Sequence, residues 1–579
     1  MKIAAAQLNP TVGDLDANAQ KVAAARAHAA REGADLVVFP ELFITGYPPE
    51  DLVLKPAFQE AARARVLALA QDFDDEGPGV LLGTIWVEDG KVYNAVVLLE
   101  KGEVAAVRYK VDLPNYGVFD EKRVFATGPL PGPIAFRGIK IGVPICEDIW
   151  SDEVAECLAE CGAELLIVPN GSPFDWKKPD VRLNIAVARV TETELPLIYV
   201  NQVGGQDELV FDGGSFALGV DRSLVLQMPQ WTEQIIITDW TKQDGVWTCG
   251  NKGPLAPIVE GDAAAYAACM LGLHDYVEKN GFPGVVLGLS GGIDSALVAA
   301  LAVDALGPER VHAVMLPYRY TSKASLKDAA DCAEALAIRY DIIPISSPVE
   351  GFEGALANLF KATNADITEE NLQSRTRGTI IMAISNKFGA MVLTTGNKSE
   401  MSVGYATLYG DMNGGFNPIK DLYKSEVYRL ARWRNANRPP HAKGPGGIVI
   451  PENILTKAPT AELRDNQTDQ DSLPPYDALD DILACLVEKE MSVPDIIARG
   501  HAPETVKKVE RLLYISEYKR RQAAPGVKIS SRNFGRDRRY PITNRFRETA
   551  AAAGSDTTVA AARSIPRSVA PRADGGEMA

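Results

Sequence analysis

The chain has 579 residues, of which 46% are hydrophobic and 23% charged, and its formal net charge is −16. A single hydrophobic core stops growing at roughly 250–300 residues, so the length predicts at least two domains. The composition is that of a globular protein, and the net negative charge argues against general nucleic-acid binding. Every apolar run falls short of the ~18 residues needed to cross a membrane. Seven cysteines without a C-x-x-C pair indicate a cytoplasmic protein without a zinc site.

The first half of the chain alternates short apolar runs with amphipathic segments. A helix is predicted over 15–32, and strands are predicted at 3–8, 36–39, 80–87, 95–99, 139–145, 165–168 and 197–200. Many short strands with few helices between them predict a layered α+β sandwich. Cys157 and Cys161 lie four residues apart on an expected helix, and we predict that they are core residues rather than metal ligands.

Three predicted strands are followed by residues that can do chemistry, namely Glu41, Lys110 and Cys146. A cysteine is a strong nucleophile only as the thiolate, which a neighbouring base and cation can supply. A glutamate could take the thiol proton and return it to a leaving amine. A lysine could stabilise the oxyanion of a tetrahedral intermediate. Each residue alone is more often a surface or core residue, so only their combination points to a nucleophilic site.

Together with their neighbours, these three residues resemble the nitrilase, or carbon–nitrogen hydrolase, superfamily. The matching segments are 40–48, 109–121 and 142–150, in the family's order and spacing, and the resemblance extends from residue 1 to about 265. It implies a four-layer αββα sandwich and a triad that hydrolyses an amide through a thioester. It also implies that the segment 169–178 lines the amide pocket of members that use glutamine. The residues that this resemblance assigns to glutamine are Tyr116, Glu121, Ser172 and Lys178.

The second half is organised around the loop Gly288-Leu-Ser-Gly-Gly-Ile-Asp-Ser295. An apolar run at 285–287 precedes this loop and a helical run at 296–303 follows it, so it lies where a strand becomes a helix. Glycines let the backbone curl until its N–H groups converge on an anion at the helix N-terminus. Three interpretations remain open for the loop alone: a phosphate-binding loop, the G-x-S-x-G elbow of a serine esterase, and a structural turn.

The sequence around this loop favours phosphate binding. A Gly- and Pro-rich linker at 250–257 is followed by predicted helices at 263–279, 325–339 and 373–387 and strands at 311–316, 342–345 and 390–394. This alternation predicts a doubly wound parallel sheet, whose ligands gather at the carboxyl ends of the strands. A serine elbow needs a later histidine, and the three that follow, His312, His441 and His501, lie in unsuitable contexts.

The segment Ser290-Gly-Gly-Ile-Asp-Ser295 resembles the signature of the ATP pyrophosphatase family, which cleaves ATP to AMP and pyrophosphate. With a nitrilase-like domain ahead of it, the chain resembles the glutamine-dependent NAD synthetases over about residues 1–545, and the segments 370–377, 393–400, 409–411 and 416–420 agree. The residues expected at ATP are Gly288, Leu289, Ser290, Gly291, Gly292, Ile293, Asp294, Ser295, Thr395 and Lys420. Those expected at deamido-NAD are Asn371, Arg375, Arg377, Glu400, Asp411 and Lys519. Magnesium is expected at Asp294 and Glu400.

The resemblance implies a glutaminase domain at 1–260 and an NAD synthetase domain at 261–548, and a disordered tail is predicted at 549–579 from its Ala-, Ser- and Pro-rich composition. Ammonia from glutamine would pass to an adenylated deamido-NAD. Expected partners are the substrates deamido-NAD, ATP and L-glutamine, together with a second copy in a homo-oligomer, because nitrilase-like domains tend to pair. Two alternatives are an amidase whose second half only binds a nucleotide, and a serine esterase that uses Ser290.

Overall fold

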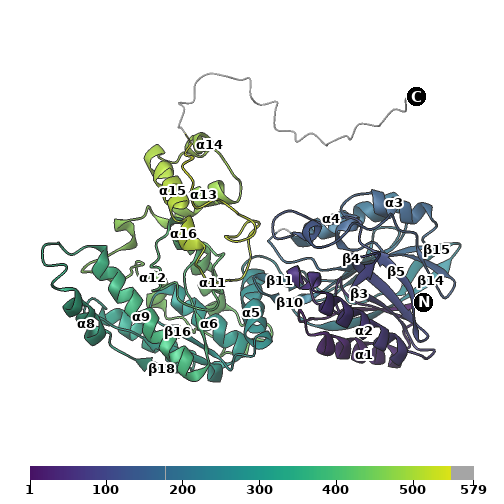
Figure 1. Ribbon diagram of the computed structural model, residues 1–579, viewed down its shortest axis with the longest axis horizontal. Helices are drawn as coiled ribbons and strands as arrows, with labels where there is room; N and C mark the ends of the chain where they lie inside the picture. Colours follow the sequence, from purple (N-terminus) through teal and green to yellow (C-terminus); the bar gives the residue numbers. More distant parts are fainter. Residues whose placement is uncertain (177, 549–579) are drawn as a thin grey trace, which may run out of the picture.

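The computed structural model describes residues 1–176 and 178–548, and these form two domains that lie side by side (Figure 1). The first domain, purple to blue, holds two large sheets, and the second, teal to yellow, holds one smaller sheet. The predicted disordered tail, 549–579, lies outside the described residues.

The first domain is built on two sheets and a hairpin. In spatial order, one sheet contains β15 (Val246–Asn251), β14 (Gln234–Gln243), β1 (Lys2–Gln7), β2 (Leu36–Val38), β3 (Gly79–Glu88), β4 (Lys91–Glu100) and β5 (Glu103–Tyr109). The other contains β13 (Leu224–Gln227), β12 (Phe216–Leu218), β9 (Leu197–Asn201), β8 (Leu165–Asn170), β7 (Ile139–Gly142) and β6 (Ile134–Phe136). The hairpin pairs β10 (Val203–Gln206) with β11 (Leu209–Asp212).

The two sheets pack face to face, and each is covered outside by two helices. Leu36 of β2 and Leu165 of β8 lie between the sheets. The next residue in each strand, Val37 or Leu166, packs against the outer helices, because successive strand side chains point to opposite faces. The helices are α1 (Leu15–Arg31) and α2 (Pro56–Asp72) on one side, and α3 (Glu153–Glu160) and α4 (Lys178–Thr193) on the other. The expected αββα sandwich is therefore confirmed.

The second domain is a doubly wound sheet, as expected. Its four strands are all parallel, in the order β18 (Arg339–Ile342), β17 (Val311–Met315), β16 (Val285–Gly288) and β19 (Met391–Leu393). Its helices are α5 (Gly261–Lys279), α6 (Ile293–Leu306), α7 (Lys323–Ala335), α8 (Ser346–Leu356), α9 (Ile367–Phe388), α10 (Lys398–Val403), α11 (Lys424–Ala436), α12 (Glu452–Thr456), α13 (Tyr476–Val487), α14 (Val493–Ala498), α15 (Pro503–Ile515) and α16 (Glu517–Arg520). None of the helices in the described residues is long and apolar enough to span a bilayer.

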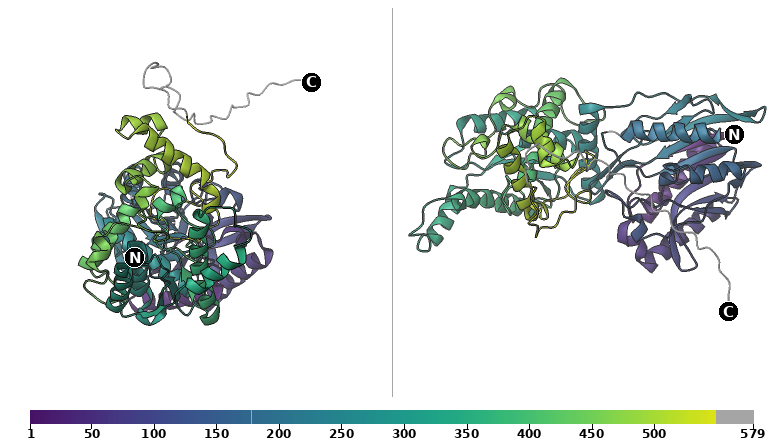
Figure 2. Two further views of the ribbon diagram at one scale, coloured as in Figure 1. Left: turned by 90° about the vertical axis from the view of Figure 1, so that its left-hand side faces the viewer. Right: turned by 90° about the horizontal axis from the view of Figure 1, so that it is seen from above.

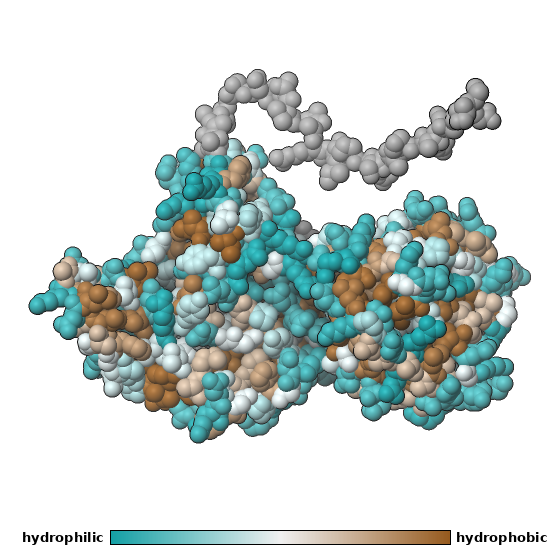
Figure 3. All heavy atoms as spheres, in the orientation of Figure 1, coloured by the Kyte–Doolittle hydropathy of each residue, from teal (hydrophilic) through white to brown (hydrophobic). Residues whose placement is uncertain are grey.

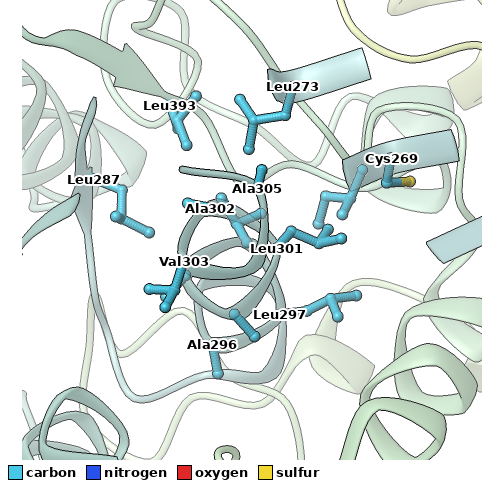
Figure 4. Close-up of a cluster of buried hydrophobic side chains, with 14 of the residues drawn as sticks. Cys269, Leu273, Leu287, Ala296, Leu297, Leu301, Ala302, Val303, Ala305 and Leu393 are labelled. Carbon is cyan, nitrogen blue, oxygen red and sulfur yellow. The ribbon is translucent and has the colours of Figure 1, made fainter. Parts of the chain in front are cut away.

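Helix α6 forms the centre of this domain. Most of its side chains are apolar, and its residues from Ser295 to Leu306 are buried on all sides of the helix. Figure 4 shows Leu297 and Leu301 of α6 on the side of Cys269 of α5, and Val303 on the opposite side, toward Leu287 of β16. Because α6 begins directly after the glycine-rich loop, this packing holds the loop at the carboxyl end of β16.

Several expectations from the sequence are wrong in detail. The strand expected at 342–345 is displaced, since β18 ends at Ile342, although Ile343 still donates to Met315 of β17 and Ile345 to Pro317 just after it. The strand expected at 139–145 ends at Gly142, before a turn. Cys161 is exposed and Cys157 only partly buried, because α3 packs against its sheet through Val154 and Leu158 instead.

The domains meet where α5 packs on the β10–β11 hairpin, at the junction visible in Figures 1 and 2. The Lys279 ammonium, on α5, donates to the backbone carbonyls of Pro10 at 2.9 Å and Gly205 at 2.7 Å. Across the same junction Lys420 pairs with Glu208 of the hairpin at 2.9 Å. The hairpin of the first domain therefore forms much of the contact with the second domain.

A buried ion pair in the second domain predicts a large stability effect. Asp304 of α6 and Arg434 of α11 are both fully buried and joined at 2.9 Å, and the Tyr266 hydroxyl donates to Asp304 at 2.6 Å. We expect Asp304→Ala to cost about 3–5 kcal/mol, because it leaves a guanidinium charge buried without a partner. The measurement is the urea midpoint of unfolding. Adding Arg434→Met, which removes that charge, should recover most of the loss, and no recovery would contradict this account.

Candidate active sites

The first candidate site is a buried cluster of the three residues expected from the sequence. Glu41 follows β2, Lys110 follows β5, and Cys146 follows β7 at a turn. The Lys110 ammonium pairs with Glu41 at 2.7 Å and with Glu121 at 2.9 Å. The hydroxyl of Tyr47 donates to Glu121 at 2.8 Å. The structure thus brings a base, a cation and a thiol to one end of the sandwich.

Local backbone geometry aims Cys146 into this cluster. Its φ is 48°, a left-handed value that is strained for a residue other than glycine. The Asp148 carboxylate accepts from the N–H of Ile145 at 2.9 Å and from the N–H of Asp112 at 2.7 Å. One carboxylate therefore ties the cysteine turn to the loop that carries Lys110.

The charges in this site favour a neutral thiol at rest. Burial and then the Glu41 charge raise the pKa of Cys146 well above its ordinary value. Burial opposes the charge on Lys110, but Glu121 and Glu41 more than offset it and raise its pKa. Burial also raises the pKa of Glu121. The arrangement suits a thiol that loses its proton to Glu41 as it attacks, rather than a standing thiolate.

The residues expected to bind glutamine surround this cluster unevenly. Tyr116 is 49% exposed, and its hydroxyl donates to Glu147 at 2.8 Å. The Lys178 ammonium lies 4.5 Å from the centre of the Trp150 ring. By contrast Ser172 is buried, and its hydroxyl accepts from the Arg182 guanidinium at 3.0 Å. Tyr116 and Lys178 can contact a ligand that enters from solvent, whereas the Ser172 hydroxyl already accepts a hydrogen bond from Arg182.

The second candidate site is a cavity of about 320 Å³ at the carboxyl ends of β16 and β19, within the size range of small-molecule sites. The loop lines it, from Gly288 to Ser295 except Gly291. Gly291 has φ +76°, and a Cβ there would lie 2.3 Å from the Ser325 carbonyl oxygen, so only glycine fits. The Ser295 hydroxyl accepts from the Ser290 N–H at 3.2 Å, which holds the loop curled at the N-terminus of α6.

Acidic and basic groups meet on one wall of this cavity. The Lys424 ammonium pairs with Asp294 at 2.5 Å and with Glu400 at 3.1 Å. Burial opposes this ammonium's charge, but Asp294 and Glu400 raise the pKa of Lys424 above its ordinary value. Burial raises the pKa of Glu400 to about 8. Asn397 also donates to Asp294 at 2.8 Å. Two carboxylates therefore converge on a position that accepts a cation.

The residues expected at the dinucleotide divide into two groups. Arg377, Glu400 and Asp411 line the cavity, as does Thr395 from the ATP set. Burial lowers the pKa of Arg377 to about 10 and raises that of Asp411 to about 6. The others lie beside the cavity and bond to the segment 404–408 and its neighbours. Those are Asn371, which accepts from Thr407, Arg375, which donates to Leu408, and Lys519, which donates to Gly404 and Ala406.

Lys420, expected at ATP, does not line the cavity and instead pairs with Glu208 across the domain junction. Two other lysines line the cavity, Lys457 and Lys424. Lys424 lies four residues after Lys420, at the start of α11, and pairs with Asp294. The sequence does not show which of Lys420 and Lys424 faces Asp294. The direction in which α11 leaves the preceding loop decides it. Tyr47 and Asn94 were likewise missed. Tyr47 lies in the matching segment 40–48 but was given no role, and Asn94 lies in a strand outside all matching segments.

The chain combines a buried Cys–Glu–Lys triad in one domain with an S-G-G-x-D-S loop on a doubly wound parallel sheet in the other. This combination defines a class of ligases that hydrolyse an amide and activate a second substrate with ATP. The Ser290 hydroxyl supports no esterase, since its hydrogen bonds are to Gly292 and Ser295, while His312 bonds to Asp341.

Comparisons with known proteins agree on this class. The carbon–nitrogen hydrolase family model matches residues 2–245, and the NAD synthase model matches residues 265–523. The glutamine-dependent NAD(+) synthetase of Rhodobacter capsulatus is 53% identical, over 94% of this chain and 99% of the relative. That of Xanthomonas campestris is 47% identical, over 94% and 98%. The solved structure of the Acinetobacter baumannii synthetase with ADP matches at TM-score 0.74 and 43% identity, over 94% and 98%.

The chain therefore belongs to the glutamine-dependent NAD(+) synthetases. It is a ligase that combines a carbon–nitrogen hydrolase domain with an ATP-using NAD synthase domain, and both the resemblance and the fold class predicted from the sequence are confirmed.

Proposed function

We propose that this protein completes NAD formation by amidating deamido-NAD, with ATP as the activating substrate and L-glutamine as the nitrogen donor. The products are NAD, glutamate, AMP and pyrophosphate. The observation that carries the proposal is the presence, in one chain, of the buried triad around Cys146 and the loop cavity beside Asp294. We assign the first activity to residues 1–260 and the second to 261–548.

In the first domain Cys146 attacks the side-chain amide of glutamine while Glu41 takes the thiol proton. The Lys110 ammonium stabilises the oxyanion that forms on the amide oxygen. Glu41 then gives its proton to the leaving nitrogen, ammonia departs, and water hydrolyses the thioester. Tyr116 and Lys178 hold the amino-acid end of glutamine, while Glu121 holds Lys110 in place.

In the second domain the nicotinate carboxylate of deamido-NAD attacks the α-phosphorus of ATP, and pyrophosphate leaves. Ammonia then displaces AMP to form the amide. N–H groups of the Ser290–Ser295 loop and the α6 N-terminus bind the phosphates, and the Lys424 ammonium balances their charge. Arg377, Asp411 and Lys519 bind the dinucleotide. Ammonia travels between the sites along a sheltered passage, because in bulk water at neutral pH it is mostly unreactive ammonium.

Magnesium fits the wall formed by Asp294 and Glu400, where two carboxylates face one cationic group. Among the described residues no three His, Cys, Asp or Glu side chains gather to hold a metal ion. Substrate phosphates would therefore supply further ligands, which is usual for Mg²⁺. When bound, the ion offsets charge on the departing pyrophosphate.

The metal assignment predicts an asymmetric effect of chelation. EDTA should stop NAD formation, because phosphate charge is no longer offset, and leave glutamine hydrolysis at the triad unchanged. The two rates are followed as NAD and glutamate in parallel samples, and added Mg²⁺ should restore the first. Equal loss of both rates would contradict a metal confined to the second domain.

We further propose a cytoplasmic homo-oligomer. Exposed apolar side chains lie at the end of the second domain where α8 leads into α9, visible as brown areas in Figure 3; they are Phe352, Leu359 and Ile367. Exposed patches of this kind are typical of protein contacts. Sedimentation would test the oligomeric state.

The test of the main proposal is an assay of the purified protein with deamido-NAD and ATP, supplied with glutamine or with ammonium. Both mixtures should yield NAD and pyrophosphate. Glutamate release without pyrophosphate would instead support the alternative of an amidase that only binds a nucleotide.

A further inference from the structure

Asn94 of β4 lies beside the triad, and the mechanism above gives it no role. Its side chain is 1% exposed. Its Nδ2 donates to Glu41 Oε1 at 2.7 Å and approaches Glu121 Oε2 at 3.5 Å. An asparagine amide does not titrate, so this donor stays in place whatever the protonation state of its neighbours.

The hydrogen bonds to Glu41 distinguish its two oxygens. Oε1 accepts from Lys110 at 2.7 Å and from Asn94 at 2.7 Å, and these two donors fill its two lone-pair sites. Oε2 accepts from the Gly171 N–H at 3.0 Å, which leaves one site open. The same N–H also lies near the Cys146 thiol, where it lowers the pKa of that thiol, so Oε2 is the oxygen on the cysteine side.

We propose that Asn94 is a positioning residue that, with Lys110, closes Oε1 of Glu41 to protons and makes Oε2 the atom that exchanges them with Cys146 and the leaving nitrogen. Without Asn94 a site on Oε1 opens, and a proton held there points away from the sulfur. This inference rests on the proposed amide hydrolysis.

The proton movements balance at this one atom. The S–H bond of Cys146 breaks, an O–H bond forms at Oε2, and the sulfur electron pair attacks the amide carbon. When the C–N bond breaks, nitrogen keeps the bonding pair and takes the proton back from Oε2. The thioester is hydrolysed in the same way, with water as the proton donor and sulfur as the final acceptor.

The pH profile should report this role. The Asn94 N–H donates to the Glu41 carboxylate, so without it the acidic limb of kcat/KM should move to higher pH. Because several charged groups lie together here, the limb reports the cluster rather than a single residue. The titratable groups that face Glu41 are Tyr47, Lys110, Glu121, Cys146 and Glu147, and all of them remain in the variant.

The experiment compares Asn94→Ala with Asn18→Ala in the full chain. Asn18 is equally buried in the same domain, and its amide donates to the carbonyls of Thr11 and Ile44. For Asn94→Ala we expect kcat for glutamine hydrolysis to fall ~10- to 100-fold and the acidic limb to rise by about one pH unit. KM for glutamine and the ammonium-dependent rate should stay unchanged. For Asn18→Ala the melting temperature should fall and the limb stay in place.

An unmoved limb in Asn94→Ala, or an equal shift in Asn18→Ala, would overturn the inference and leave Asn94 a structural residue. If Asn94→Ala does not fold, Asn94→Ser replaces it in the experiment, because the serine side chain is too short for its hydroxyl to reach Glu41. A wild-type protein that hydrolyses no glutamine would refute the proposed function, not this assignment.

Discussion

Replacing Cys146 with alanine should abolish glutamine-dependent NAD formation, by at least about 10⁴-fold, because no other group can form the thioester. The same variant should keep its rate with ammonium, since the cavity at Asp294 belongs to a separate sheet and core. Alanine removes one buried sulfur from a site fixed by the hydrogen bonds of Asp148, so the turn should persist. The measurement is NAD formed with each nitrogen donor at saturating ATP.

The matched control is Cys157→Ala, which removes a partly buried thiol from α3 of the same domain. It should leave both rates unchanged. If Cys146→Ala loses both rates while its melting temperature matches the wild type, the two domains do not act separately, and the division of chemistry proposed above is wrong.

Replacing Asp294 with asparagine should produce the opposite pattern. NAD formation with either donor should fall ~10²- to 10³-fold, because the wall loses the charge that holds a cation against the phosphates. Glutamine hydrolysis by the first domain should continue. Asparagine has the shape of aspartate. Lys424 and Asn397 bond to different oxygens of Asp294, and the single oxygen of asparagine can still accept from Lys424, so the cavity should keep its form.

A control for this second variant is Asp331→Asn, on the exposed face of α7, where the carboxylate pairs with Lys327. Its NAD formation should match the wild type. Unchanged synthesis in Asp294→Asn would remove Asp294 from the reaction, and Lys424→Ala would then show whether the wall contributes at all.

The apolar periodicity and the strand–helix alternation in the sequence were sufficient to predict the architecture. Strand side chains that alternate between two cores, as at Leu36 and Val37, follow from the period of the strand, and the parallel sheet follows from strand–helix alternation. Errors fell at element ends, such as β18 at Ile342. There, hydrogen bonds to a neighbouring strand, rather than local apolarity, decide where the strand stops.

For the sites, the sequence by itself determined the chemical groups: Glu41, Lys110 and Cys146 follow strands, and the Ser290–Ser295 loop begins a helix, all readable from short motifs. Only the tertiary structure decided which side chains face them. It turned Lys424 rather than Lys420 toward Asp294 and brought Asn94 of β4 onto Glu41. The physical reason is that such contacts join residues far apart in the chain, and their partners are set by how sheets and helices pack, which leaves no local pattern in the sequence.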